Sequence, residues 1–204
     1  MESFRKHTGK VVPLDKVNVD TDQIIPKQFL KRIERTGFGE FLFYDWRFSA
    51  DGKKNADFVL HQPRYANASI LVAGKNFGCG SSREHAVWAL TDFGFRVVIA
   101  SSFADIFANN SLKNGLLTVR LTDQQVAEIT QRSKDIENYE LTADLENLRV
   151  DDAHGFSANF AMDEFLRHCL LNGLDDIGLT MQHEPAIAAY EAKNPVRADL
   201  ASIL

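Results

Sequence analysis

Three short runs of apolar residues recur along the first two thirds of the chain. They are residues 68–73 (ASILVA), 95–100 (FRVVIA) and 116–121 (LLTVRL). Continuous rather than alternating apolar positions are typical of strands that are buried on both faces of a sheet. We therefore predict three central strands, preceded by a further strand at 9–14 (GKVVPL).

Segments with helical character separate these strands, at residues 81–93 and 104–113. One face of the first segment carries its apolar residues, Ala86, Val87, Leu90 and Phe93. Ser81 and Glu84 have the S-x-x-E spacing of a capping box, so we expect this helix to begin at Ser81. The alternation of strand and helix predicts an α/β domain with parallel strands.

The last third of the chain is more polar. We predict a surface helix, a hairpin, and a helix closed by Gly173, at residues 123–134, 139–150 and 163–172 respectively. The segment after Gly178 contains no further strand pattern. We therefore expect a single domain over residues 1–178 and a helical, partly mobile C-terminal tail over residues 179–204.

Composition excludes several classes of protein. The 204 residues are 45% hydrophobic and 25% charged, the formal net charge is −5, and the basic residues are scattered, which disfavours a nucleic-acid partner. Apolar runs such as VVIA are too short to span a bilayer, and the first ten residues lack the apolar core of a signal peptide. We expect a cytoplasmic protein with no membrane partner.

The two cysteines, Cys79 and Cys169, are too far apart for a CxxC pair. We expect no metal site in this chain. Two thiols cannot supply the thiolates that hold an iron–sulfur cluster, so a cluster used by this protein has to be bound by another chain.

The candidate chemistry lies in residues 74–85, GKNFGCGSSREH. The stretch does not match the GxxxxGK[ST] phosphate loop, and it only partly matches GxGxxG, because Arg83 stands at the third glycine position. Two interpretations remain open. The turn is a helix cap alone, or its amides and Arg83 hold a carboxylate while a serine in that positive field acts as a base.

Other polar positions have equally plain structural explanations. Asp20 and Asp22 flank Thr21 and are typical of an Asx turn or a helix cap. Asn110, in the stretch ANNSLKNG, is suited to capping a helix or to lining a polar pocket. His85 stands near Trp88, and we expect it to be packed or on the surface rather than catalytic.

Four ordered motifs resemble one family over essentially the whole chain. They are NVDTDQIIPKQFLKR (18–32), GKNFGCGSSREHAVWAL (74–90), SFADIFANNSLKNGLL (102–117) and FLRHCLLNGLDDIGLT (165–180). They are similar to the small subunits of 3-isopropylmalate dehydratase, also called isopropylmalate isomerase. The resemblance implies the swivelling β/β/α domain of the aconitase superfamily, on a polypeptide separate from a large subunit that carries a four-iron four-sulfur cluster.

The resemblance also implies an activity and a site. The activity is a hydro-lyase reaction of leucine biosynthesis, which interconverts 2-isopropylmalate and 3-isopropylmalate through 2-isopropylmaleate. Ser81 would be the base and Arg83 the anchor of a substrate carboxylate. Other residues would bind or orient the substrate, namely Gly80, Ser82, Asp20, Thr21, Asp22 and Asn110, with Phe29 and Leu30 in a discriminating loop at 27–36.

The sequence departs from single-chain aconitases, which have glutamate in the place of Cys79 and an arginine near the place of Pro13. These departures argue against a catalytic Cys79 and against a second carboxylate clamp. Three alternatives stay open: a related hydro-lyase for citraconate or methylmalate, a nucleotide- or phosphate-binding α/β protein, and a structural partner protein with no residue in the active site.

Overall fold

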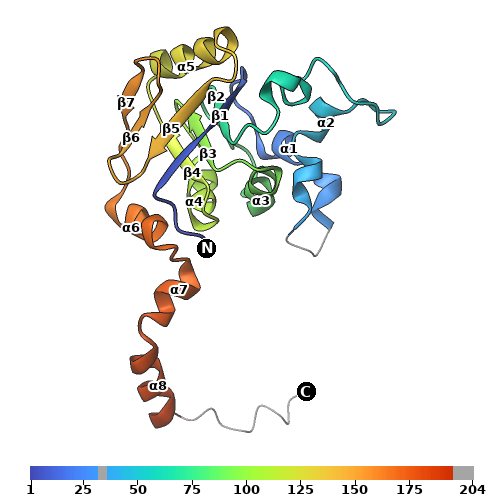
Figure 1. Cartoon of the computed structure of the whole chain (residues 1–204). Coiled ribbons are helices and arrows are strands. Elements are labelled where there is room, and N and C mark those ends of the chain that lie inside the picture. Colours follow the sequence, from blue (N-terminus) through green and yellow to red (C-terminus); the bar gives the residue numbers. More distant parts are fainter. Residues whose placement is uncertain (32–35, 195–204) are drawn as a thin grey trace.

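The computed structural model describes residues 1–31 and 36–194, which fold around a seven-stranded sheet with the strand order β4-β3-β2-β1-β5-β6-β7 (Figure 1). The central strands run parallel: β1 (Lys6–Leu14), β2 (Ile70–Ala73), β3 (Val97–Ala100) and β4 (Leu117–Arg120). The four strands predicted from the apolar runs are thus confirmed, with small shifts at their ends.

An antiparallel wing extends the sheet beyond β1. It contains β5 (Glu140–Asp144), β6 (Arg149–Asp151) and β7 (Ser157–Asn159). The predicted hairpin corresponds to β5 and β6. Strand β7 was not predicted, because its three residues contain a single buried side chain, Ala158, and show no periodicity.

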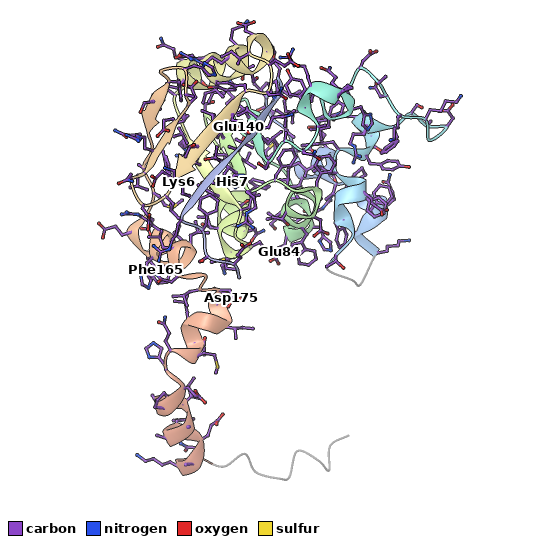
Figure 2. The ribbon with its side chains drawn as sticks, in the orientation of Figure 1. Lys6, His7, Glu84, Glu140, Phe165 and Asp175 are labelled. Atoms are coloured by element: carbon purple, nitrogen blue, oxygen red, sulfur yellow. The ribbon has the colours of Figure 1, made fainter. Side chains whose placement is uncertain are left out.

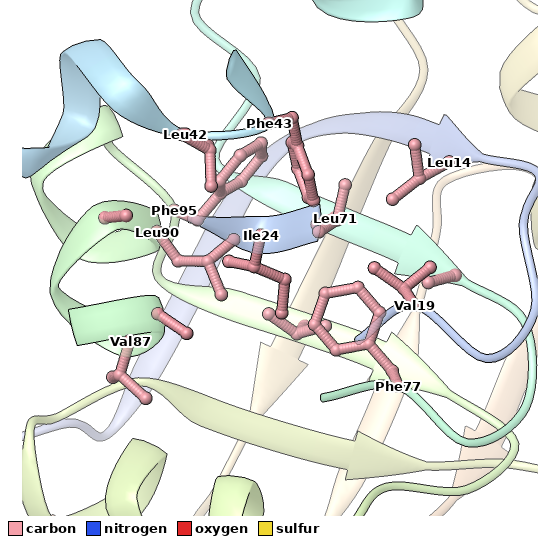
Figure 3. Packing of buried hydrophobic residues seen from close by; sticks show 14 of the residues in the cluster. Leu14, Val19, Ile24, Leu42, Phe43, Leu71, Phe77, Val87, Leu90 and Phe95 are labelled. Atoms are coloured by element: carbon pink, nitrogen blue, oxygen red, sulfur yellow. The ribbon is translucent and has the colours of Figure 1, made fainter. Parts of the chain in front are cut away.

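The parallel strands separate two hydrophobic clusters. In β2, Leu71 and Ala73 belong to the cluster under α3, which Figure 3 shows, whereas Ile70 and Val72 belong to the cluster that includes α5. Both faces of the strand are therefore buried, and this is why apolar residues are continuous along it.

Helices lie on both sides of this sheet. The helices within residues 1–31 and 36–194 are α1 (Thr21–Ile24), α2 (Tyr44–Arg47), α3 (Glu84–Phe93), α4 (Asp105–Lys113), α5 (Asp123–Asp135), α6 (Glu164–Asn172), α7 (Asp176–Met181) and α8 (Glu184–Lys193). Short 3₁₀ turns occur at Lys27–Lys31, Phe38–Phe41, Val59–His61 and Pro63–Tyr65. The predicted cap at Gly173 is confirmed, since its φ is 68° and its amide bonds the carbonyls of Cys169 and Leu170.

The predicted start of α3 is wrong. The helix begins at Glu84, its N-cap is Arg83, and no side chain caps it. The carboxylate of Glu84 accepts a hydrogen bond from Asn114 Nδ2 at 2.8 Å instead of reaching back to the turn. Ser81 and Ser82 therefore remain in the turn, where their hydroxyls are not used for capping.

The C-terminal helices α7 and α8 extend away from the body as an arm (Figure 1), and every residue from Thr180 to Asn194 is exposed. Figure 2 labels Phe165 and Asp175 where the arm leaves the body. The expected domain boundary at 178 falls inside α7, and residues 195–204 of the expected tail lie outside the described residues. Within ranges 1–31 and 36–194, no helix has the length and apolar character needed to cross a membrane.

Candidate functional site

Three loops meet at the carboxyl ends of β1, β2 and β3. The amide of Gly78 donates to Val19 O at 2.8 Å, the amide of Thr21 donates to Cys79 O at 2.9 Å, and Phe77 N donates to Ser102 O at 3.0 Å. These bonds continue the parallel ladder beyond the strands, so the three motifs lie side by side. Ligands of open α/β sheets bind outside the carboxyl ends of the strands.

A pocket of about 210 Å³ opens between these loops. It is lined by Thr21 at the start of α1, by Gly78, Gly80, Ser81, Ser82 and Arg83 from the turn after β2, and by Ala104 with the first three residues of α4, Asp105, Ile106 and Phe107. The structure thus brings together five of the residues proposed from the sequence, Thr21, Gly80, Ser81, Ser82 and Arg83.

Gly78 sets the shape of the turn. Its φ is 77°, and a Cβ at this position would lie 2.1 Å from Cγ of Phe107. Glycine is required here because it adopts positive φ and lets the backbone press against α4. Further along the same turn, Gly80, Ser81, Ser82 and Arg83 line the pocket.

Ser81 is held by its backbone and exposes its side chain. Its carbonyl accepts from Thr21 Oγ1 and from the amide of Arg83, both at 2.8 Å. No side chain in the described ranges makes a hydrogen bond with the hydroxyl of Ser81 or Ser82. Both hydroxyls are therefore available to a ligand.

Arg83 is the pocket's cation, and its partner is Asp22. Nη1 of Arg83 forms an ion pair with Oδ1 of Asp22, and Lys27 Nζ lies 3.4 Å from the second oxygen, Oδ2. The side chain of Arg83 is only 14% exposed, whereas that of Asp22 is 41% exposed. The guanidinium is therefore held at the wall of the pocket.

The remaining predicted residues lie outside the pocket lining. Asp20 is the N-cap of α1 and forms a capping box with Gln23, as the cap interpretation expected. Asn110 lies on α4, and Phe29 and Leu30 pack against the core cluster, with Phe29 stacked on Phe41 at 4.0 Å. Residues 32–35 of the expected discriminating loop lie outside the described residues.

Sequence reasoning did not single out the third wall of the pocket. Ile106 is 54% exposed although it is a large apolar residue, and Asp105 lies beside it. The available signal was their place at the start of the helix that follows a buried strand, because parallel strands end at a common edge.

His85 and Cys79 lie outside the lining of the pocket. His85 packs against Phe38 and Trp88, and its pKa is lowered, chiefly by burial. The pKa of the Cys79 thiol is raised by burial and by the charge of Asp20. Of the two positions expected for His85, packed or on the surface, the structure shows a half-buried ring in contact with aromatic neighbours. The part of the chain that the structure describes contains no group of three or more His, Cys, Asp or Glu side chains placed to hold a metal ion.

Comparison with known proteins places this architecture in a class. The family model of the aconitase C-terminal domain matches residues 1–124, and a second model, for the C-terminal domain of the 3-isopropylmalate dehydratase small subunit, matches residues 176–198. A crystal structure titled 3-isopropylmalate dehydratase, from Methanocaldococcus jannaschii, has the same fold, with a TM-score of 0.67 and 22% identity over 91% of this chain and 99% of that chain. The predicted fold class is confirmed.

Proteins of similar sequence define the family more narrowly than the fold does. The chain is 60% identical to the 3-isopropylmalate dehydratase small subunit of Brevibacillus brevis over 95% of this chain and 100% of that protein. It is 60% identical to that of Koribacter versatilis over 94% of this chain and 98% of that protein. The chain belongs to the family of 3-isopropylmalate dehydratase small subunits. The name of this family implies a large-subunit partner.

Proposed function

We propose that this chain supplies the base and the carboxylate anchor of a two-subunit hydro-lyase that interconverts 2-isopropylmalate and 3-isopropylmalate through 2-isopropylmaleate in leucine biosynthesis. One observation carries the assignment. Ser81 and Arg83 face one open pocket at the carboxyl edge of the sheet, in a chain 60% identical to small subunits of 3-isopropylmalate dehydratase. The interpretation of this turn as a helix cap alone is not supported, because neither serine caps α3.

The chemistry of these two residues fits the reaction. Removal of a proton from the carbon beside a carboxylate places negative charge on that carboxylate. A guanidinium fork is suited to hold this charge with two parallel N–H bonds. The oxygen of Ser81, in its deprotonated form, takes the proton in dehydration and returns it in rehydration, while the hydroxyl group leaves the substrate in the first step and is added back in the second.

The hydroxyl group needs an acceptor as it leaves the substrate. We assign it to the large subunit, whose four-iron four-sulfur cluster would supply a Lewis-acidic iron. The exposure of the Ser81 side chain to solvent supports a partner that closes over the pocket. The free thiols of Cys79 and Cys169 suit the reducing cytoplasm, where we place the enzyme.

The test is an anaerobic reconstitution. The purified chain is mixed with the cluster-bearing large subunit, 3-isopropylmalate is added, and the absorbance of 2-isopropylmaleate is followed, with each protein by itself as the control. We expect activity in the mixture only. Inactivity with an intact cluster would overturn the proposal, and equal turnover of methylmalate would replace the substrate while keeping the reaction class.

A further inference from the structure

The ion pair between Asp22 and Arg83 connects helix α1 to the arginine proposed to bind the substrate carboxylate. On the basis of the proposed function, we propose that Asp22 is a positioning residue that fixes the guanidinium of Arg83 for the substrate carboxylate. Asp22 is itself placed outside the pocket lining, so its effect passes through Arg83. The proposal rests on three features of the site.

The first feature is the division of the guanidinium donors. Asp22 engages Nη1 of Arg83, and within residues 1–31 and 36–194 no group accepts a hydrogen bond from Nη2 or Nε. A guanidinium carries five N–H donors in a planar fork. With one edge held by Asp22, the other edge keeps a pair of donors that match the two oxygens of a carboxylate.

The second feature is the rigidity of the element that carries Asp22. Asp20, at the N-cap of α1, forms reciprocal bonds with Gln23 at 2.8 and 3.0 Å. Thr21 donates to Cys79 O through its amide and to Ser81 O through its hydroxyl. The first pair of bonds fixes the turn around Asp22, and the second pair ties that turn to the segment before Arg83. The two segments therefore hold one relative position.

The third feature is the charge balance. A carboxylate beside an anion site repels a dianionic substrate, and Lys27, whose ammonium lies 3.4 Å from Asp22 Oδ2, offsets that charge. Lys27 is 72% exposed and begins the 3₁₀ segment Lys27–Lys31 that contains Phe29 and Leu30. Asp22 can thus orient Arg83 while Lys27 reduces the repulsion between the Asp22 carboxylate and the substrate.

The kinetic test uses the reconstituted complex. Asp22→Asn should raise KM for 3-isopropylmalate about tenfold while kcat changes less than about threefold, because orientation of the anchor is lost. Asp22→Glu should recover part of the loss. In an Arg83→Lys background, Asp22→Asn should add no further effect, since both changes act on one contact. Asp45→Asn, an equal charge change on an exposed residue of α2, is the control.

A second measurement does not depend on catalysis. In the isolated chain, ¹⁵N NMR of the arginine side chains should show a separate, slowly rotating Nη signal for Arg83 that is averaged away in Asp22→Asn. An averaged signal in the unmodified chain would overturn the inference, whatever the activity of the complex. A lower KM in Asp22→Asn would also overturn it, because Asp22 would then compete with the substrate. An inactive complex with an ordered Arg83 would instead count against the proposed function alone.

Discussion

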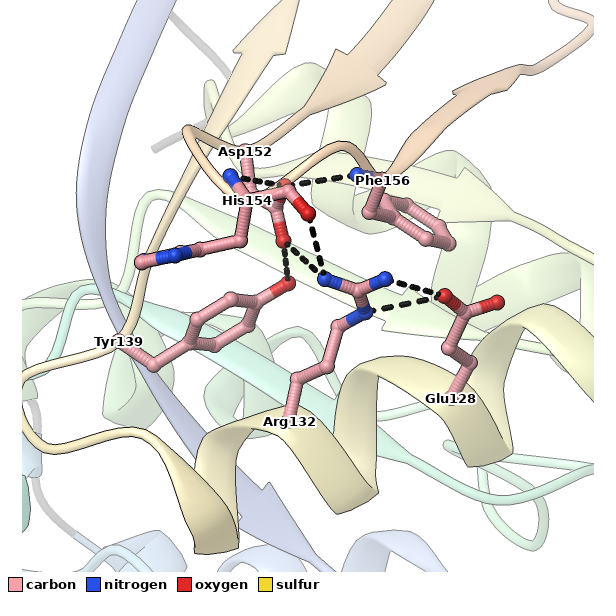
Figure 4. A network of polar contacts seen from close by, with 6 residues as sticks. All are labelled: Glu128, Arg132, Tyr139, Asp152, His154 and Phe156. Carbon is pink, nitrogen blue, oxygen red and sulfur yellow. Dashed lines mark hydrogen bonds and ion pairs between the residues drawn. The ribbon is translucent and has the colours of Figure 1, made fainter.

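Two arginine–aspartate pairs in this molecule differ in how deeply the aspartate is buried and in how many of its neighbours are hydrogen-bonded. In the first, shown in Figure 4, the side chain of Asp152 is fully buried and accepts from Tyr139 Oη at 2.7 Å and from Arg132 Nη1 at 3.2 Å. The amides of His154 and Phe156 also donate to Asp152, at 2.8 Å each. Arg132 also bonds Glu128 at 2.8 Å, so this network joins α5 to the antiparallel wing.

The second pair, Arg83 and Asp22, lies at the carboxyl edge of the parallel strands, partly exposed, with unused guanidinium donors and with free serine hydroxyls beside it. A buried carboxylate is stable only when its oxygens are paired, whereas a binding site has to keep donors in reserve. The same two residue types therefore hold the fold together at one place and are available to bind a ligand at the other.

The largest expected effect is on the catalytic rate, at the pocket that contains Arg83 and Asp22. Ser81→Ala should lower kcat of the reconstituted complex by about 10³-fold, because the base is removed. The melting temperature and assembly should not change, since the hydroxyl has no partner among residues 1–31 and 36–194. Ser157→Ala, at an exposed position of β7 away from the pocket, is the matched control. A normal kcat in Ser81→Ala would show that the base lies elsewhere.

Arg83→Lys should lower kcat/KM by about 10²-fold, because an ammonium keeps the charge but cannot offer two parallel N–H bonds to a carboxylate. Steady-state kinetics of the complex measures this loss. If lysine supports the normal rate, the charge alone is sufficient and the fork is not used.

For the buried pair of Arg132 and Asp152, the expected effect is on stability. Asp152→Asn should lower the free energy of unfolding by about 2–4 kcal/mol, because the buried donors lose a charged acceptor. Its neighbour Asp151, which pairs with Arg149 at a partly exposed position, provides the control. Asp151→Asn should lower the free energy of unfolding by less than about 1 kcal/mol. Urea titration of both variants measures these losses. Equal losses would show that burial does not distinguish the pairs.

The contribution of Asp152 should also depend on pH. Burial by itself raises the pKa of this carboxyl, but hydrogen bonds from Tyr139, Phe156 and His154 and the charge of Arg132 outweigh burial and lower the pKa. In the unfolded chain the pKa of an aspartate is about 4. Because the pKa of Asp152 is lower in the folded chain, the ionised carboxylate stabilises the fold above about pH 4, and this stabilisation is lost as the pH falls through the folded pKa. The stability difference between the unmodified chain and Asp152→Asn should therefore narrow below about pH 4. A difference that stays constant from about pH 7 to about pH 3 would contradict this assignment.

The smallest effect is expected for Tyr139→Phe, which removes one hydrogen bond to Asp152 and leaves the ring in the core. We expect a loss of about 1–2 kcal/mol in the free energy of unfolding, since the bond is to a charged group. A loss much larger than this would mean that the phenol also organises the loop around His154.

The parallel half of the sheet could be predicted because each strand is buried on both faces and shows it in a continuous apolar run, as Ile70–Ala73 does. Strand β7 could not, since its pairing with β6 depends on contacts that three residues do not encode. The start of α3 was misplaced for a similar reason. Glu84 had two possible partners, and in the folded chain its carboxylate bonds the side chain of Asn114 rather than the turn.

The sequence by itself determined the family, the α/β class and the turn that carries Ser81 and Arg83, because these depend on local motifs and on apolar periodicity. Only the tertiary structure decided which residues meet that turn. Asp22 is 61 positions away from Arg83, and Ile106 comes from the first turn of α4. Their positions follow from the parallel register of β1, β2 and β3, which brings the ends of distant segments to one edge of the sheet.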